Sequence, residues 1–286
     1  SLLWVVPGLV LVAGFVYYPL VENIYLSFFQ WSVFKPIPPE FVGGANYAHA
    51  AQDPIFWRSL FNNIAYAVVS LVFQVAGVLI LAALVETFVR KRGGILRAIY
   101  FIPSAISLTV AGLLFYFLYQ PETGLLNEFL RVVGLGGFAQ AWLGQESTAI
   151  WAIIVMSQWQ SFGYTTLLYS VAIQRIPREL YDAADLDGLG AIRRIWYITT
   201  PLVREMSTLL IIVTVTGAFQ VFNEVMVMTP AAPNNSSQVL GTWLYHAGFI
   251  NNEFGYAAAI ATVVFVITIV LAVVQLWISR RRRVEW

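Results

Sequence analysis

Long apolar stretches separated by short charged segments make up most of this sequence. A membrane-spanning helix needs about 20 consecutive, predominantly apolar residues. Pro7, Pro19 and Pro103 fall inside such stretches, and membrane helices tolerate them. The pattern predicts an all-α membrane protein with one domain over residues 1–286. Its six transmembrane helices are expected at about 2–29, 59–85, 98–119, 148–174, 203–228 and 255–279.

Composition agrees with this pattern. Hydrophobic residues make up 59% of the chain and charged residues 11%, whereas a soluble domain is about a quarter charged. The chain has no cysteine, which excludes disulfides, thiolate metal sites and cysteine nucleophiles. No basic patch suggests a nucleic-acid partner. The stretch Leu2 to Val21 is too long for a signal-peptide core and is expected to be the first span.

Lysine and arginine predict the orientation, because short cytoplasmic loops carry an excess of them. The second connection has four (90, 91, 92 and 97), the fourth has five (175, 178, 193, 194 and 204), and the C-terminal tail has four (280–283). Of the 16 in the chain, only Lys35, Arg58 and Arg131 fall on the other side. Both termini and the loop 177–201 are therefore expected to be cytoplasmic.

The loop 177–201 is unusually polar for this chain. Pro177 suits the first position of a helix, where its missing N–H is no loss. Glu179, Asp182 and Asp185 would share one side of that short helix, and Gly188 and Gly190 interrupt it. A second amphipathic turn is predicted from the spacing of Ile192, Ile195, Trp196 and Thr199.

This loop resembles the EAA loop of binding-protein-dependent ABC importer permeases. Asp182-Ala183-Ala184, Gly188, Ile198 and Pro201 occupy the matching places, with Asp182 where the family usually has Glu and Leu189 where Ala follows the glycine. The resemblance implies a coupling helix that sits in a cleft of a cytoplasmic ATPase subunit. The residues expected to couple to the ATPase are Glu179, Asp182, Ala183, Ala184, Asp187, Gly188 and Pro201.

Further motifs extend the resemblance, in order, over nearly the whole chain. They are similar to motifs of sugar-type permeases and lie at 41–47, 56–63, 97–103, 124–135 and 254–259. At 229–233 the family usually shows T-x-G-G-P, and here Ala231 and Ala232 replace both glycines. Each motif is weak alone, but together they identify the chain as resembling the transmembrane subunit of a type I ABC sugar importer.

That resemblance implies partners and a location. The expected partners are a second homologous permease, two ATP-binding subunits, an extracytoplasmic solute-binding protein, membrane lipid and a sugar substrate. The chain would lie in the prokaryotic inner membrane, bind no cofactor and leave ATP and Mg²⁺ to the ATPase subunits. No Walker A loop is present, so this chain would not hydrolyse ATP by that route. His49 and His246 are expected to be loop or interface residues, not a metal pair.

A sugar pathway needs hydrogen-bonding partners and flat apolar faces, and the fourth and fifth spans contain both. The candidate pathway residues are Gln158, Trp159, Phe162, Tyr164, Gln220, Asn223 and Glu224. Helix packing is an alternative role for the aromatic residues, and an interface or interhelix contact is one for Glu22 and Glu224. Gly163 and Gly217 could allow close helix approach.

Two other functions stay open at this point. The same architecture could import glycerol-3-phosphate or a related phosphodiester, although a phosphate would favour Arg or Lys in the path and no span interior contains one. An ion-driven secondary transporter should show inverted repeats with broken helices at the membrane midplane, and no convincing repeat is seen.

Overall fold

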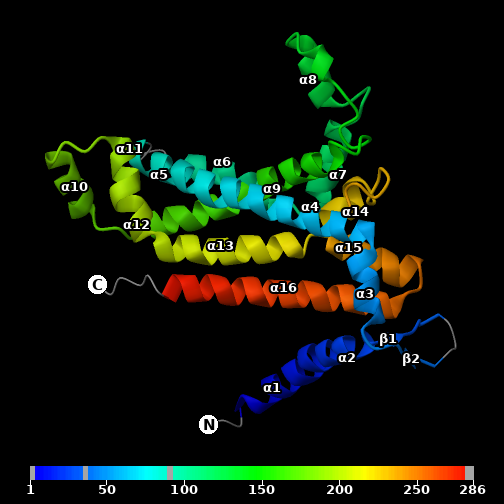
Figure 1. Ribbon diagram of the computed structural model, residues 1–286. Coiled ribbons are helices and arrows are strands. Elements are labelled where there is room, and N and C mark those ends of the chain that lie inside the picture. Colours follow the sequence, from blue (N-terminus) through cyan, green and yellow to red (C-terminus); the bar gives the residue numbers. More distant parts are fainter. Residues whose placement is uncertain (1–3, 35–37, 89–92, 281–286) are drawn as a thin grey trace.

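The computed structural model describes residues 4–34, 38–88 and 93–280. Long helices run side by side through these residues, and shorter helices join them at both ends (Figure 1). The long stretches are α1 (Val6–Val12) with α2 (Tyr18–Leu26), α4 (Pro54–Ser70) with α5 (Val78–Phe88), α6 (Gly93–Ala105) with α7 (Leu108–Leu118), α9 (Ala149–Gln174), α13 (Arg204–Phe219) with α14 (Asn223–Met228), and α16 (Phe254–Arg280).

The connecting elements are short. They are β1 (Phe29–Gln30) and β2 (Glu40–Phe41), α3 (Ala45–Gln52), α8 (Leu125–Val132), α10 (Arg178–Leu186), α11 (Ala191–Arg194), α12 (Thr200–Leu202) and α15 (Leu240–Tyr245). The two strands form an antiparallel pair with Phe29 opposite Phe41. Among the described residues this pair is the whole of the β-structure, so the fold class is the predicted helical one.

Three helices in the described part of the chain are long and apolar enough to cross a membrane: Val6–Leu26, Pro54–Glu86 and Phe254–Ile278. Two bent pairs also reach this standard when each is taken as one span, Ala98–Ala105 with Leu108–Leu118 and Ala191–Leu202 with Arg204–Phe219. The 26-residue α9 matches the fourth predicted range in length. It is more polar than the others because Ser157 to Thr166 interrupt its apolar sequence.

Two predicted spans are not straight helices. The helix axis turns by 95° between Ala105 and Leu108. Pro103 lacks the N–H that would continue the helical ladder, and the Ser107 side chain caps the next helix by accepting from the Val110 N–H at 3.4 Å. The fifth predicted span is interrupted between Phe219 and Asn223.

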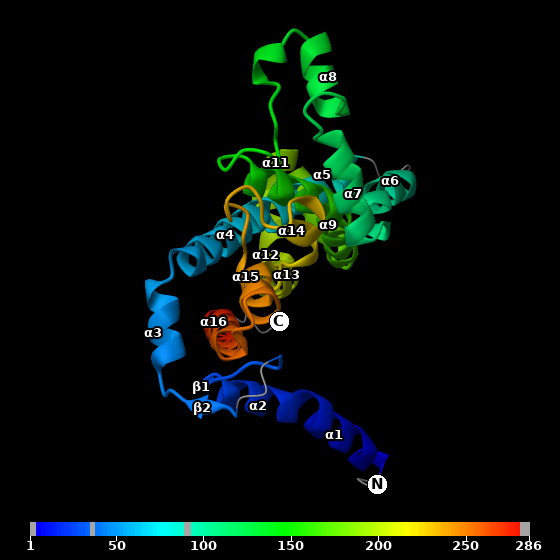
Figure 2. The same cartoon turned by 90° about the vertical axis from the view of Figure 1, so that its right-hand side faces the viewer.

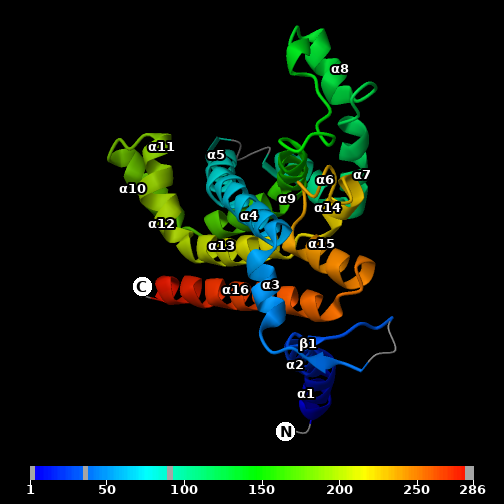
Figure 3. The same cartoon turned by 45° about the vertical axis from the view of Figure 1, so that its right-hand side comes forward.

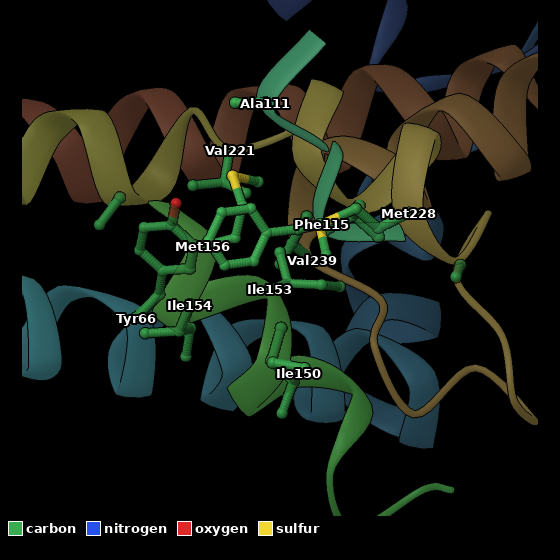
Figure 4. Close-up of a cluster of buried hydrophobic side chains, with 14 of the residues drawn as sticks. Tyr66, Ala111, Phe115, Ile150, Ile153, Ile154, Met156, Val221, Met228 and Val239 are labelled. Carbon is green, nitrogen blue, oxygen red and sulfur yellow. The ribbon is translucent and has the colours of Figure 1, made fainter. Parts of the chain in front are cut away.

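Helix α9 lies at the centre of the bundle and contacts α4, α5, α6, α7, α13 and α14. Ile153, Ile154 and Met156 are fully buried there in a cluster with Phe115 and Met228, seen in Figure 4. A second apolar cluster surrounds Tyr169, Ile173 and Leu210 nearer the other end of α9. These clusters hold the walls of the site described below.

Helices α6 and α9 approach unusually closely at Gly163. A Cβ atom there would lie 2.0 Å from the Tyr100 carbonyl oxygen, so only glycine fits without moving α6. The structure thus agrees with the close-approach role considered for Gly163. At Gly217 a Cβ would meet no atom within 4 Å, so that role does not apply within this chain.

The first helical stretch stands apart from the bundle (Figure 2). Its segments from Val6 to Leu26 have no buried residue. Contact with α16 is made near the end of α2, where the Asn23 side-chain amide donates to the Ala258 carbonyl at 3.3 Å and to the Thr262 hydroxyl at 3.2 Å. Most of the surface of this helix is therefore uncovered by the other residues that the structure describes.

The two ends of the bundle differ. Helices α10 and α11 lie at the same end as the C-terminal end of α16, and β1, β2 and α15 lie at the other (Figures 1 and 3). The predicted topology requires the loop 177–201 and the end of the last span to share one side, and α10 and the C-terminal end of α16 lie at the same end of the bundle. Which end faces the cytoplasm is predicted from the lysine and arginine distribution alone.

Candidate functional site

A pocket of about 380 Å³ opens beside the middle of α9. Helices α4, α6, α9, α13 and α14 contribute to its wall, so it is assembled from segments far apart in the sequence. Most polar groups on the wall are hydroxyls and amides, and the rest of the wall is apolar. The lining residues are Tyr66, Ser70, Gln74, Phe101, Ser104, Ser157, Gln160, Ser161, Tyr164, Thr165, Leu210, Val213, Thr214, Gly217, Ala218, Val221 and Glu224.

Three helices meet at a hydrogen-bonded group on this wall. The Tyr66 hydroxyl of α4 is hydrogen-bonded to the Ser157 hydroxyl of α9 and lies 3.2 Å from the Glu224 carboxylate of α14. A carboxylate only accepts, and a tyrosine hydroxyl has one proton to donate. When Glu224 is ionised, the favoured arrangement therefore has Ser157 donating to Tyr66 and Tyr66 donating to Glu224. Figure 4 shows Tyr66 at the edge of the apolar cluster that supports it.

A second polar group ties α9 to the end of α4. The Gln74 side-chain amide donates to the Gln158 carbonyl oxygen at 2.9 Å, and the Gln158 amide donates to the Ser70 hydroxyl at 3.0 Å. All three residues are buried. Because buried polar groups are costly without partners, this group fixes the register between the two helices.

The opposite wall is fixed by Ser104 of α6. Its hydroxyl donates to the Gln160 carbonyl at 2.6 Å and accepts from the Tyr164 backbone N–H at 3.0 Å. The bend between α6 and α7 places Ser104 against α9 just before the chain turns away. Ser104 therefore holds the α9 backbone where Gln160, Ser161 and Tyr164 face the pocket.

The candidate pathway residues lie in different places. Tyr164 and Glu224 line the pocket, while Gln158 is buried in the polar group described above. Trp159 packs against Phe115 with ring centroids 5.1 Å apart, and Phe162 packs edge-on against Tyr100 at 5.7 Å. Gln220 and Asn223 are exposed on either side of the helix break.

Several wall residues were not singled out from the sequence, among them Tyr66, Ser70, Ser104, Ser157 and Thr214. Each is a polar residue inside an apolar predicted span, and this is the signal that could have identified it. The sequence does not show which of these residues face one another, because that depends on the bends in α6–α7 and α13–α14.

Asn63 secures the break between α13 and α14. Its side-chain amide donates to the Ala218 carbonyl at 2.6 Å, and its side-chain oxygen accepts from the Leu240 N–H at 2.8 Å. Asn62 beside it donates to the carbonyls of Ser236 and Gln238. The bond to Ala218 satisfies a carbonyl at the C-terminal end of α13, and the others satisfy backbone groups in the loop before α15 and in its first turn.

The second candidate site is the loop at the end of the bundle. Helix α10 ends in a turn where Gly188 adopts φ +72° and the Leu189 N–H donates to the Ala184 carbonyl at 2.9 Å. This left-handed conformation favours glycine. Side-chain bonds then tie α10 to residues 191–202, the returning chain that leads from the turn back to α13. Arg194 and Asp185 form an ion pair, and the hydroxyls of Tyr181 and Thr199 lie 2.9 Å apart.

Burial raises the pKa of Tyr181 above its ordinary value. Its hydroxyl is protonated at neutral pH, as that of an ordinary tyrosine is, so a proton is available for the bond with Thr199. Together with the Arg194–Asp185 pair, this bond fixes the angle between α10 and the returning chain.

The residues predicted to couple to an ATPase sit mostly on the open side of this loop. Glu179, Asp182, Ala183, Asp187, Gly188 and Pro201 are exposed, and Ala184 is buried. Leu186 and Ile192 add apolar surface, with exposed fractions of 90% and 70%. The loop thus presents acidic, small and apolar groups together, a composition suited to docking against another protein.

In the described part of the chain, no group of three or more His, Cys, Asp or Glu side chains is placed to hold a metal ion. The two histidines lie near the end of the bundle opposite the loop. His49 stacks on Tyr256 with ring centroids 4.4 Å apart, and His246 stacks on Trp243 at 5.4 Å.

Residues 78–284 match the family model described as the inner membrane component of binding-protein-dependent transport systems. The chain belongs to this family. Over 275 residues it is 50% identical to a probable ABC transporter permease protein, YurN, of Bacillus subtilis, covering 96% of this chain and 94% of that protein. It is 30% identical to the arabinooligosaccharide transport permease AraP of the same organism, covering 93% and 83%.

A solved structure of a bacterial alginate ABC transporter, in complex with an alginate pentasaccharide-bound periplasmic protein, has the same fold as this chain. The TM-score is 0.84 at 22% identity, over 97% of this chain and 93% of that one. These findings confirm the predicted family, the helical permease fold and the inner-membrane location. As an ABC permease, the chain is a transport subunit of a class that is not itself catalytic.

Proposed function

We propose that this permease forms half of the translocation path of an ATP-driven saccharide importer. A second, homologous permease would complete the path, and two ATPase subunits would dock at the loop 177–201. A soluble binding protein would deliver the substrate at the opposite end. The observation that carries the proposal is a pocket rich in hydroxyls and amides, halfway along the helix whose end leads directly into an exposed docking loop.

The connection between pocket and loop is short and stiff. Helix α9 carries Ser157 and Tyr164 on the pocket wall and ends at Gln174, and three residues separate it from the start of α10. The returning chain leads into α13, which carries Thr214 on the same wall. Tyr169 of α9 joins these two helices by donating to the Ser207 hydroxyl of α13 at 3.0 Å. Movement of α10 would therefore shift the parts of the pocket wall on α9 and on α13 together.

ATP, with Mg²⁺, would act through the ATPase subunits and not on this chain. Its binding would favour the closed ATPase pair and bring the two coupling loops together. A ligand that prefers one of two states shifts the population toward that state. The permease pair would then change from an inward-facing to an outward-facing arrangement, in which the binding protein releases its saccharide.

A saccharide is favoured as the substrate class for two reasons. The relative AraP is named for arabinooligosaccharides, and the alginate transporter shares the fold. The wall also offers many neutral hydrogen-bonding groups for sugar hydroxyls. Glycerol-3-phosphate or a phosphodiester is the second candidate, but the described wall has no Arg or Lys to pair with a phosphate. An ion-driven transporter is less favoured because it leaves the docking loop without a role.

The test is purification of the chain from its native membrane with everything that remains bound. We expect a second permease, an ATPase subunit and ATP hydrolysis that rises when the saccharide-loaded binding protein is added. Stimulation by a binding protein loaded with a phosphodiester would replace the saccharide with the second candidate. A chain that purifies alone and moves solute on an ion gradient would contradict the ATPase coupling.

A further inference from the structure

Glu224 is the one charged side chain on the described wall of the pocket. Its exposed fraction is 7%, and it lies where a membrane helix is interrupted. A carboxylate at such a position is costly, and charges inside membrane segments mark functional sites by default. A neutral sugar does not require it, because serine, threonine and glutamine side chains already supply neutral hydrogen-bonding partners around the pocket.

The groups facing Glu224 do not neutralise its charge. Tyr66 of α4 and Ser157 of α9 are hydroxyls, and the nearby polar lining residue of α13 is Thr214. No Arg, Lys or His is among the described lining residues. Tyr66 gives one carboxylate oxygen a hydrogen bond, but no described lining residue supplies a positive charge that would balance the ionised carboxylate. A carboxylate that is ionised without a buried counterion is costly, and a ligand ammonium group that pairs with it would offset that cost.

The aromatic group on the same wall suits a sugar ring. Tyr164 is half exposed, and its backbone is held in place by Ser104. One pocket thus contains an anionic acceptor, neutral hydrogen-bonding groups and an aromatic surface.

We propose that Glu224 selects a saccharide that carries a basic amine, such as an amino sugar or a sugar–amine conjugate. The ammonium group pairs with the Glu224 carboxylate, while Tyr66 and Ser157 hold that carboxylate in place. An acidic saccharide is repelled by the same group. This inference rests on the proposed function, since it names the substrate class of the same pocket.

The experiment uses the complete importer in vesicles, with ATP supplied to the ATPase side and the binding protein on the other. The probes are glucosamine oligosaccharides of one to five units, the same oligosaccharides N-acetylated, and uronic acid oligosaccharides of matched length. Mass spectrometry measures what accumulates. We expect the wild type to prefer the amine-bearing probes over their N-acetylated counterparts by about tenfold or more, as close buried charge pairs do.

Two substitutions separate charge from shape. Glu224→Gln keeps the size of the side chain and removes the charge, so the amine preference should fall to within about twofold of unity. Glu224→Asp keeps the charge and should keep the preference. Glu146→Gln removes an exposed carboxylate that pairs with Arg58 at 3.5 Å, away from the pocket, and should leave the preference unchanged.

The possible results are distinct. Equal uptake of amine-bearing and N-acetylated probes by the wild type would overturn the inference. An unchanged preference in Glu224→Gln would also overturn it, because the variant uses the same binding protein and the preference would then come from that protein. If no saccharide accumulates while ATP is hydrolysed, the saccharide assignment fails, and this inference fails with it. Uptake of N-acetylated or acidic probes alone would overturn the amine selection but leave the saccharide importer intact.

Discussion

The coupling loop and the pocket are built in opposite ways. The loop 177–201 is a local structure, in which residues close in sequence form a short helix, a glycine turn and a returning segment. Its docking residues are mostly exposed and make few contacts with the rest of the chain. The pocket takes residues from five helices, and its polar side chains are buried and bonded to one another.

Because of this difference, substitutions in the two regions should have different kinds of effect. A change in the pocket wall disturbs helix packing, because side chains there hold the helices in register as well as face the substrate. A change in the loop leaves the bundle intact and alters how motion passes to it. Substitutions in the two regions should therefore affect different measurements, and three of them test this expectation.

The largest effect is expected at Gly163. Gly163→Ala places a methyl group against the Tyr100 carbonyl, where a Cβ would lie at 2.0 Å, and α6 must move away from α9. Overpacking of this kind costs about 1–3 kcal/mol of folding free energy, sometimes more. Thermal unfolding of the purified chain in detergent should show a clearly lowered midpoint.

Gly217→Ala is the matched control, because it adds the same methyl group at a position with no atom within 4 Å. It should unfold at or slightly above the wild-type midpoint, because alanine meets no neighbour there and is a better helix former than glycine. Equal losses at both positions would show that the contact between α6 and α9 does not determine the result, because alanine is the better helix former at both positions.

The sequence predicted the loop better than the pocket, because the loop is formed by residues close in sequence and the pocket by residues far apart. The loop depends on spacing within about 25 residues, so Pro177, the acidic residues and Gly188 were enough to predict a helix, a turn and a return. The helical ranges followed from apolar stretches alone. The pocket depends on the bend after Ala105 and the break after Phe219, and neither is encoded by a local pattern that gives its direction.

Glu224 and Tyr164 show that the sequence could identify some of the residues that line the pocket. Both are polar or amphipathic residues in predicted spans, and both lie on the wall. Gln158 and Trp159 satisfied the same criterion but face neighbouring helices. A polar residue in a span needs partners, and the sequence does not show whether these are other side chains or a substrate.

The second prediction concerns Gly188, which has φ +72° and open space around it. Gly188→Val is not hindered by neighbouring atoms, but its backbone conformation costs an L-residue about 1–2 kcal/mol. The turn after α10 should therefore change, and ATP-driven transport should fall about tenfold, because 1.4 kcal/mol corresponds to a factor of ten. Thermal unfolding of the bundle should hardly change.

Gly188→Asn provides the control, since asparagine adopts left-handed conformations more readily than other residues with side chains. It should transport at a rate near that of the wild type. If valine and asparagine reduce transport equally, the size of the side chain at the docking surface matters more than the turn. Normal transport by the valine variant would contradict the docking role of this loop.

The smallest effect is expected from the ion pair inside the loop. Asp185 is paired with Arg194, and their side chains are 56% and 19% exposed, so solvent weakens the interaction. Exposed pairs contribute about 0.2–1 kcal/mol, and Arg194→Ala or Asp185→Ala should reduce the ratio of substrate transported to ATP hydrolysed less than about fivefold. The double exchange Asp185→Arg with Arg194→Asp should recover part of that ratio, because it restores opposite charges across the same gap. No recovery in the exchanged variant, with each single variant impaired, would mean that Asp185 acts on the docked ATPase and not on the angle of α10.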